Sequence, residues 1–330
     1  MTDETMLIDV MDSRVKRREE RRDLFRMLGG KALMAGVATA AAATAAEAQT
    51  TAPTDADILN FALNLEYLEA QFYSFASFGK GLDNSILGGT GTQGTVTGGS
   101  QVPFQDVIVR QYAREIANDE INHVKFLRGA LGAAAVSQPA LDIGSDPNGA
   151  FSSAARSAGL IGAGESFNPY ADDNSFLLGA FIFEDVGVTA YKGAAPLLTS
   201  KVFLEAAAGL LAVEAYHASL VRTTLYGKGV QMPALRTSAD KISDARDSLD
   251  GTTDLDQGIS PIATGADAPA AQSSTASNIV PLDANGLAFS RSTGQVLNIV
   301  YLNKAAVTKG GFFPNGVNGT NNALKTSAAN

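Results

Sequence analysis

The sequence predicts an all-α protein whose centre is a four-helix bundle with one long crossover. Four stretches of about 20–28 residues carry apolar side chains at helical spacing, and each stretch is followed by glycine. The segment 133–172 separates the second stretch from the third and suits a crossover between two helix pairs. Both histidines of the chain close a Glu-x-x-His motif, one in the second stretch and one in the fourth. These features together predict two helix pairs that face one another.

The first predicted helix covers residues 55–78. Thr54 or Asp55 is a suitable N-cap, and Gly79 ends the helix. The apolar residues that recur at helical spacing are Ile58, Leu59, Ala62, Leu65, Leu68, Phe72 and Phe75. Residues 79–103, which are rich in glycine, threonine and serine, are expected to form a long loop.

The other three predicted bundle helices cover residues 104–131, 173–192 and 199–226. The connection between the third and the fourth is short, so we expect these two helices to be antiparallel neighbours. We therefore assign residues 55–227 to the bundle.

Residues 228–330, the C-terminal extension, have a different composition. One short helix is expected at 233–249 and one strand-like run at 296–302. The remainder is rich in glycine, serine, alanine and asparagine, which predicts a mostly irregular appendage on the bundle. We expect the chain to be disordered after about Asn318.

Residues 1–48 have the order of a secretory signal. A basic run at 14–26 precedes a small-residue apolar stretch at 27–46, and Ala46-Glu47-Ala48 fits a cleavage site. Arg21 and Arg22 resemble a twin-arginine signature, which predicts an exported protein, periplasmic or extracellular. The alternative is an uncleaved membrane anchor. Because alanine, glycine and threonine insert poorly, we expect no stable anchor after cleavage.

Composition excludes several classes of site and partner. The net charge of −9 argues against nucleic-acid binding. The chain has no cysteine, which removes thiolate nucleophiles, zinc fingers, iron–sulfur clusters and rubredoxin-type iron. Any bound metal must therefore use oxygen and imidazole ligands.

The chemistry-bearing residues are the two Glu-x-x-His motifs and a few further carboxylates. Glu120 with His123, and Glu214 with His217, each lie on one helix face because their spacing is i, i+3. Glu184 interrupts an apolar run, where a carboxylate is costly to bury unless it is paired or bound to metal. One such motif is weak, but two copies that hold every histidine indicate a metal site.

The first helix offers two candidate ligands, Glu66 and Glu69, on the same face. Asn118 or Asp119 could hold an imidazole of a neighbouring helix, as carboxylates near metal sites commonly do. The aromatic residues Phe72, Phe181, Phe183 and Tyr191 are interpreted as core.

Three phrases carry a family resemblance: NLEYLEAQFY at 64–73, FEDVGVTAY at 183–191 and FPNGVNG at 313–319. With the order Glu, Glu-x-x-His, Glu, Glu-x-x-His over the bundle, the chain resembles the ferritin-like superfamily and its desiccation-related exported group. The resemblance implies a ferritin-like fold with metal ligands Glu66, Glu120, His123, Glu184, Glu214 and His217. In it, Glu120 and Glu214 bridge the metals, and Tyr73 is a catalytic tyrosine beside them. Glu69 has no clear counterpart and is kept as an alternate ligand.

The resemblance implies two iron or two manganese ions that react with O₂ or peroxide. Ferroxidase-like or catalase-like stress protection is the favoured function. The alternative is a non-catalytic metal-binding or structural protein of desiccation. The long loops at 79–103 and 133–172 argue against a 24-subunit iron-storage shell, while smaller oligomers are compatible with the sequence.

Overall fold

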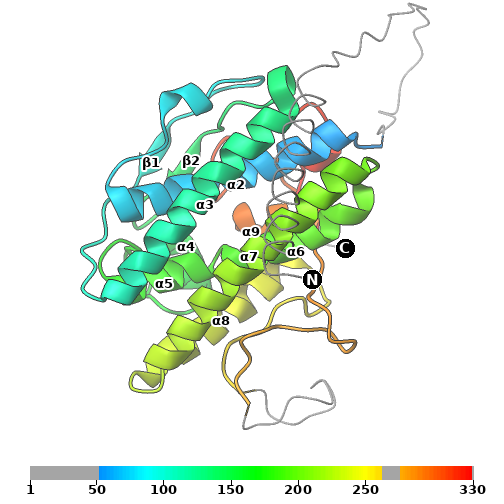
Figure 1. Ribbon diagram of the computed structural model, residues 1–330. Helices are drawn as coiled ribbons and strands as arrows, with labels where there is room; N and C mark the ends of the chain where they lie inside the picture. Colours follow the sequence, from blue (N-terminus) through cyan, green and yellow to red (C-terminus); the bar gives the residue numbers. More distant parts are fainter. Residues whose placement is uncertain (1–51, 262–275, 329–330) are drawn as a thin grey trace, which may run out of the picture.

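The computed structural model describes residues 52–261 and 276–328, which fold around a four-helix bundle (Figure 1). The bundle elements are α2 (Asp55–Phe78), α3 (Val107–Leu131), α5 (Asp173–Phe181) continued by α6 (Glu184–Ala194), and α7 (Lys201–Lys228). The closest packing is between α2 and α3 and between α6 and α7. The predicted all-α bundle with a long crossover is confirmed. The predicted export signal, residues 1–48, lies outside the described residues.

The first bundle helix, α2, begins and ends at residues whose local interactions cap it. Thr54 and Asp57 form a capping box at its N-terminus. Gly79 ends it in the left-handed region, with φ 70°, where only glycine is free of strain. Between these ends the helix is buried on most of its surface, so it lies at the centre of the molecule.

The third bundle helix is broken where the sequence predicted one continuous helix over 173–192. It ends as α5 at Phe181 and restarts as α6 at Glu184. At the break, the amides of Ile182 and Phe183 donate to carbonyls three residues back, at 3.2 and 3.0 Å, which is the tighter 3₁₀ pattern. Arg246 donates to the carbonyls of Phe181 and Ile182. The break therefore places Glu184 in the first turn of α6 and is stabilised by a distant arginine.

The two long loops contain regular structure that the sequence did not indicate. The strand β1 (Val96–Gly98) of the first loop pairs in parallel with β2 (Leu141–Ile143) of the crossover. The crossover also contains the helix α4 (Ala150–Ser157), whose Phe151 is fully buried. These elements fasten both loops to the bundle.

The C-terminal extension contains the predicted helix, α8 (Pro233–Asp250), and a second helix, α9 (Thr293–Val300). The strand predicted at 296–302 is wrong. Ser292 and Gln295 form a capping box that starts a helix here, and the apolar run that resembled a strand is buried on almost every side. Short apolar runs are ambiguous between strand and buried helix, and burial decides this case.

The disorder predicted after about Asn318 is also wrong for residues 319–328. The side-chain amide of Asn318 donates to the carbonyls of the loop residues Thr92 and Ser137. Its backbone N–H donates to Oδ1 of Asn64 on α2. Ser327 is fully buried and its backbone amide donates to the carbonyl of Val307. The tail is therefore pinned to the bundle by polar contacts that a composition-based prediction does not register.

A cluster of aromatic rings joins the bundle to the segments around it. Phe72 of α2 packs on Phe151 of α4 at 5.3 Å between ring centroids. Phe312 of the tail packs on Phe151 at 5.1 Å and on Phe183 at 4.9 Å. Edge-on and tilted packing of this kind stabilises beyond area burial alone. Phe312 of the C-terminal extension therefore contributes to the main core beside the break in the third bundle helix.

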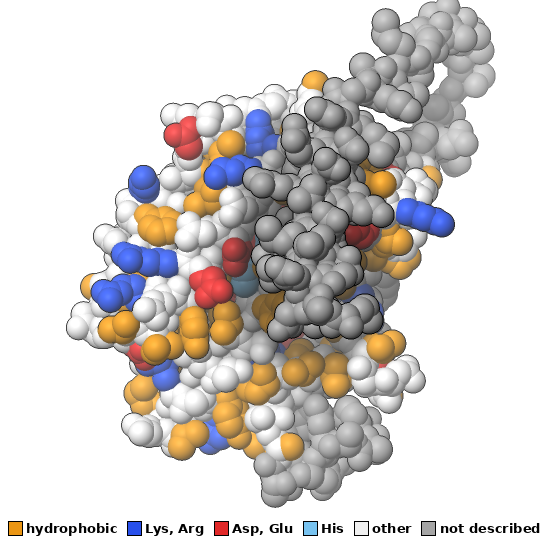
Figure 2. All heavy atoms as spheres, in the orientation of Figure 1, with side chains coloured by type: hydrophobic (Ala, Val, Ile, Leu, Met, Phe, Trp, Pro, Cys, Tyr) orange, Lys and Arg blue, Asp and Glu red, His pale blue; other side chains and the backbone are white. Residues whose placement is uncertain are grey.

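Among the described helices, α7 is long and apolar enough to cross a membrane by length and composition. It packs against α6 as a bundle helix and carries Glu214 and His217, both buried. Exposed apolar side chains on it include Val202, Leu204 and Tyr216. In Figure 2, hydrophobic side chains are scattered among charged and neutral ones over the face where α3 and α7 lie.

Candidate metal centre

Side chains from four bundle elements meet inside the bundle in what we term the carboxylate cluster. Its members are Glu66 and Glu69 of α2, Glu120 and His123 of α3, Glu184 of α6, and Glu214 and His217 of α7. Each is at most 7% exposed. The structure thus brings all six predicted ligands, and the alternate Glu69, into one buried region.

The imidazole of His123 marks one half of the cluster. Its Nδ1 lies 3.1 Å from Oε2 of Glu66, 3.5 Å from Oε2 of Glu120 and 3.7 Å from Oε1 of Glu214. One ligand-type atom from each of these four residues lies within 4.8 Å of all the others. This half of the cluster already has the convergence that a bound cation needs.

The imidazole of His217 marks the other half. Its Nδ1 lies 3.1 Å from Oε1 of Glu120 and 3.7 Å from Oε2 of Glu184. Its Nε2 lies 3.2 Å from Oδ2 of Asp119, which is the imidazole-holding contact that the sequence suggested. Asn118, the other candidate, instead bonds the carbonyl of Arg114.

Glu120 lies between the two halves. One of its oxygens faces His217 and the other faces His123. The two imidazole rings are 6.1 Å apart between centroids. A carboxylate with one oxygen toward each imidazole has the arrangement that a bridging ligand requires.

Two tyrosines hold the outer glutamates, and the arrangement is reciprocal. The Tyr73 hydroxyl donates to Oε1 of Glu184, and the Tyr191 hydroxyl donates to Oε1 of Glu66. Each tyrosine lies seven residues after the glutamate of its own helix and bonds the glutamate of the other. Tyr191, which the sequence predicts to be plain core, is thus a polar contact of Glu66 as well. The repeated seven-residue spacing was the signal that could have found it.

Glu69 breaks this symmetry. It lies three residues after Glu66, whereas the position three residues after Glu184 is Gly187. A Cβ at Gly187 would overlap Oε2 of Glu214. Burial, and then the charges of Glu120, Glu184 and Glu66, raise the pKa of Glu69 well above its ordinary value. Glu69 is therefore an additional carboxyl group that has no partner of the same kind in the other half.

Six polar atoms of the cluster are buried and make no hydrogen bond of acceptable geometry, although two of them, Nδ1 of His217 and Oε1 of Glu120, are 3.1 Å apart. The six atoms are both carboxylate oxygens of Glu120 and of Glu214, Oε2 of Glu184 and Nδ1 of His217. Buried polar groups in folded proteins are nearly always satisfied, so each such atom requires an explanation. These atoms lie in one region, and carboxylate with imidazole is the donor set that iron and manganese accept. The residues present therefore fit a metal centre.

Without a cation the cluster must hold protons instead. Burial raises the pKa of Glu66 to about 7 and that of Glu184 to about 8. The pKa of Glu214 is raised well above its ordinary value by burial and then by its neighbouring carboxylates. Although burial acts in the opposite direction, facing carboxylates raise the pKa of His123 to about 11 and that of His217 to about 10. Cations that replaced these protons would relieve the repulsion.

Comparisons with known proteins agree with this arrangement. The ferritin-like domain family matches residues 54–227. The chain is 30% identical over 277 residues to the ferritin-like catalase Nec2 of Nesocodon mauritianus, covering 80% of this chain and 84% of that protein. It is 33% identical over 254 residues to the desiccation-related protein PCC13-62 of Craterostigma plantagineum, covering 74% and 76%. No solved structure matches significantly.

Proposed function

This chain belongs to the ferritin-like domain family, and from that premise we propose that it is an exported redox protein. Its carboxylate cluster would bind two iron or two manganese ions and react with O₂ or peroxide. The observation that carries the proposal is the set of six unpartnered polar atoms within a buried group of carboxylates and imidazoles. Such atoms are costly to bury unless a cation completes them.

Different residues of the cluster would bind each of the two ions. Glu66 with His123 would serve one ion, and Glu184 with His217 the other. Glu120, and Glu214 beside it, would bridge them. When bound, two such ions supply paired electron transfer to O₂ or peroxide. The tyrosine hydroxyls on Glu66 and Glu184 fix the orientation of these carboxylates.

Peroxide disproportionation is the reaction we favour over ferroxidation. In it, two molecules of hydrogen peroxide give two of water and one of O₂, so no external reductant is needed. The relative from Nesocodon mauritianus carries the name catalase. A small cavity of about 20 Å³ between α2 and α6 is lined mainly by apolar residues, together with Glu66, Glu69 and Tyr191. A cavity of this size holds a molecule about as small as water, which is compatible with a small uncharged substrate beside Glu66.

Export is part of the proposal and rests on residues 1–48 of the sequence. An enzyme of this kind outside the cytoplasm would remove peroxide from the cell envelope. The relative named as desiccation-related supports protection during drying as the setting for that role. N-terminal sequencing of protein recovered from the exported fraction tests it. A mature chain that begins shortly after Ala48 is expected, and a chain retained in the cytoplasm with an intact N-terminus would contradict it.

Oxygen evolution from hydrogen peroxide tests the reaction. The protein loaded with manganese or with iron is compared with a Glu120→Ala/Glu214→Ala double variant and with Glu205→Ala, a control at an exposed glutamate of the same helix. We expect metal-dependent turnover in the wild type and the control, and none in the double variant. Tight binding of metal without turnover of peroxide or of Fe²⁺ with O₂ would favour the non-catalytic alternative.

A further inference from the structure

We propose that the C-terminal extension is a positioning element for one half of the metal centre. A second buried polar group, the Arg–Asp network, links the extension to the bundle. Its members are Asp185, Arg222, Arg246, Asp250, Asp256 and Arg291. We infer that this network holds Glu184 in place through its neighbour Asp185. The inference rests on the proposed metal centre.

Asp185 is the point where the network meets the carboxylate cluster. It follows Glu184 directly in α6, so the two side chains leave the helix about 100° apart. Its Oδ2 accepts from Arg222 of α7 at 2.7 Å and from Arg246 of α8 at 2.9 Å. All three side chains are buried. The rotation of the first turn of α6, and with it the direction of Glu184, is therefore set from the side of the extension.

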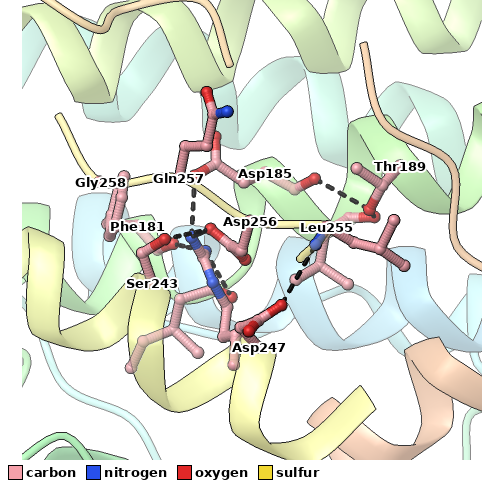
Figure 3. A network of polar contacts seen from close by, with 12 residues as sticks. Phe181, Asp185, Thr189, Ser243, Asp247, Leu255, Asp256, Gln257 and Gly258 are labelled. Atoms are coloured by element: carbon pink, nitrogen blue, oxygen red, sulfur yellow. Dashed lines mark hydrogen bonds and ion pairs between the residues drawn. The ribbon is translucent and has the colours of Figure 1, made fainter. Parts of the chain in front are cut away.

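Arg246 also holds the helix break that precedes Glu184. The same guanidinium that bonds Asp185 donates to the carbonyls of Phe181 and Ile182. Figure 3 shows Phe181, Asp185 and Asp256 within this network of polar contacts. Carbonyls at the end of a helix have no partner within the helix and need one from elsewhere. One side chain of the extension thus fixes both the end of α5 and the start of α6.

The network continues into the extension and returns to α6. The two oxygens of Asp256 accept from Arg246 at 2.7 Å and from Arg291 at 2.9 Å. Arg291 then bonds Asp250 at 2.6 Å. It also returns to α6, where its side chain and its backbone amide both donate to Thr189, each at 3.0 Å. The extension therefore holds α6 at Asp185 and again at Thr189, two residues before Tyr191.

The half of the cluster around His123 is linked to the network less directly, through Tyr191 of α6, whose hydroxyl bonds Glu66. Glu66, Glu120, His123 and Glu214 all lie on unbroken helices, and their ligand atoms already converge within 4.8 Å. Glu184, which begins a helix after a break, is outside that convergent group. Loosening the network should therefore weaken the half that contains Glu184 and His217, and leave the half around His123 intact.

A charge-balanced variant isolates this effect. Arg246→Met together with Asp256→Asn removes one positive and one negative group. It leaves the pairs of Arg222 with Asp185 and of Arg291 with Asp250 in place. Arg236→Met is the matched control, because Arg236 lies on the same helix but stacks over the ring of Tyr226 at 5.2 Å. Arg246→Lys is the second variant, which keeps the charge but cannot bond several acceptors in the fixed fork of a guanidinium.

The experiment is a titration of the full-length, metal-free protein with Co²⁺, followed by visible absorption and elemental analysis, with helical content checked by circular dichroism. The wild type and Arg236→Met should bind about two Co²⁺ per chain. In the double variant, the first Co²⁺ should bind with nearly unchanged affinity. The second should bind roughly 10–100-fold more weakly, as when outer supports of metal ligands are removed. Arg246→Lys should show the same selective loss, smaller in size.

The outcomes separate this inference from the proposed function. Folded variants that bind both Co²⁺ ions as tightly as the wild type would overturn the positioning role and leave the metal centre standing. Folded variants that lose both ions together would overturn it too, because the network would then support the whole bundle without preference. A wild-type protein that binds no Co²⁺ would overturn the metal centre and the positioning role with it. Two bound ions without turnover would contradict the redox reaction alone.

Discussion

Two buried polar groups lie against α6, and they solve the problem of buried charge in opposite ways. The Arg–Asp network balances three arginines against three aspartates, with contacts of 2.6–2.9 Å. The carboxylate cluster sets five carboxyl groups against two imidazoles. Although burial raises the pKa of Asp256, the charges of Arg246 and Arg291 outweigh it and leave that pKa low. Burial and like charges leave the pKa of Glu214 high.

The difference separates a structural group from a functional one. The network pairs equal numbers of arginines and aspartates, and each aspartate accepts from at least one guanidinium. The cluster is short of positive charge, so it is completed only by protons or cations, and it has six unpartnered atoms where the network has three, Nε of Arg222, Nε of Arg246 and Oδ1 of Asp250. Consecutive residues divide between the two groups, because Glu184 faces the cluster and Asp185 faces the network. Burial alone therefore does not point to a metal site, whereas an uncompensated excess of buried carboxylates supports one.

The largest expected effect comes from breaking the balance of the network. Arg291→Met leaves Asp250 and Asp256 without a shared partner in the interior, and we expect a loss of about 3–5 kcal/mol in the free energy of unfolding. Lys304→Met, at an exposed position, should change it by less than about 0.5 kcal/mol. Urea unfolding measures both. A loss at Arg291 no larger than that of the control would contradict the structural role of the network.

Cation removal should act on the cluster and not on the network. With free Mn²⁺ at about 100 times its dissociation constant, binding should stabilise the protein by about 2.7 kcal/mol. A chelator should therefore lower the Tm of the wild type. The Tm of a Glu120→Gln/Glu214→Gln variant should not respond to the chelator. Equal Tm values for the wild type with and without metal would remove the basis of the comparison.

A pH series on metal-free protein should expose the surplus of carboxylates. The folded-state pKa of Glu214 is raised above its ordinary value of 4.5, so its contribution to stability is present below pH 4.5 and is lost as pH rises. Glu214→Gln cannot ionise and should escape this loss, by up to about 1.4 kcal/mol for each pH unit above 4.5. Denaturant unfolding at pH 4 and pH 7 gives the comparison, with Glu205→Gln as the exposed control. A gain at pH 4 equal to that at pH 7 would exclude ionisation as the cause.

The smallest expected effect is at Gly187. Alanine there would push Glu214 aside, and we expect roughly tenfold weaker Mn²⁺ binding with a change in metal-free stability within about 1 kcal/mol. Gly209→Ala on α7 is the control, since its added Cβ would meet nothing within 4 Å. Isothermal titration with Mn²⁺ measures the affinities. Unchanged binding in Gly187→Ala would mean that Glu214 is free to move without cost.

The four-helix bundle can be predicted from the sequence because the signals that indicate it are local. The apolar periodicity, the terminal glycines and the two Glu-x-x-His motifs all act within a few turns of helix, and the resemblance to ferritin-like, desiccation-related proteins is confirmed by the comparisons. The break after Phe181 has no such signal. It depends on Arg246, which lies 65 residues further along the chain. Contacts between distant segments decide it, and no local pattern encodes them.

The same reasoning explains the other differences. The run at 296–302 has the composition of a strand and becomes a helix because it is enclosed by the core. From the sequence, Tyr191 is indistinguishable from other aromatic residues on the apolar face of its helix. Only the fold brings its hydroxyl to Glu66. The Arg–Asp network cannot be predicted from the sequence, because its six members are spread from Asp185 to Arg291 and form no motif. Hydrogen bonds and ion pairs between residues far apart in the chain are therefore the features that the sequence alone does not predict.

Metal content tests the central claim most directly. The protein, purified without added metal, is compared by elemental analysis with a Glu120→Ala/Glu214→Ala variant of equal helical content. We expect about two iron or manganese atoms per chain in the wild type, and their loss in the variant. Absence of bound metal from both, with the fold intact, would contradict this expectation. The buried carboxylates would then be held by protons alone.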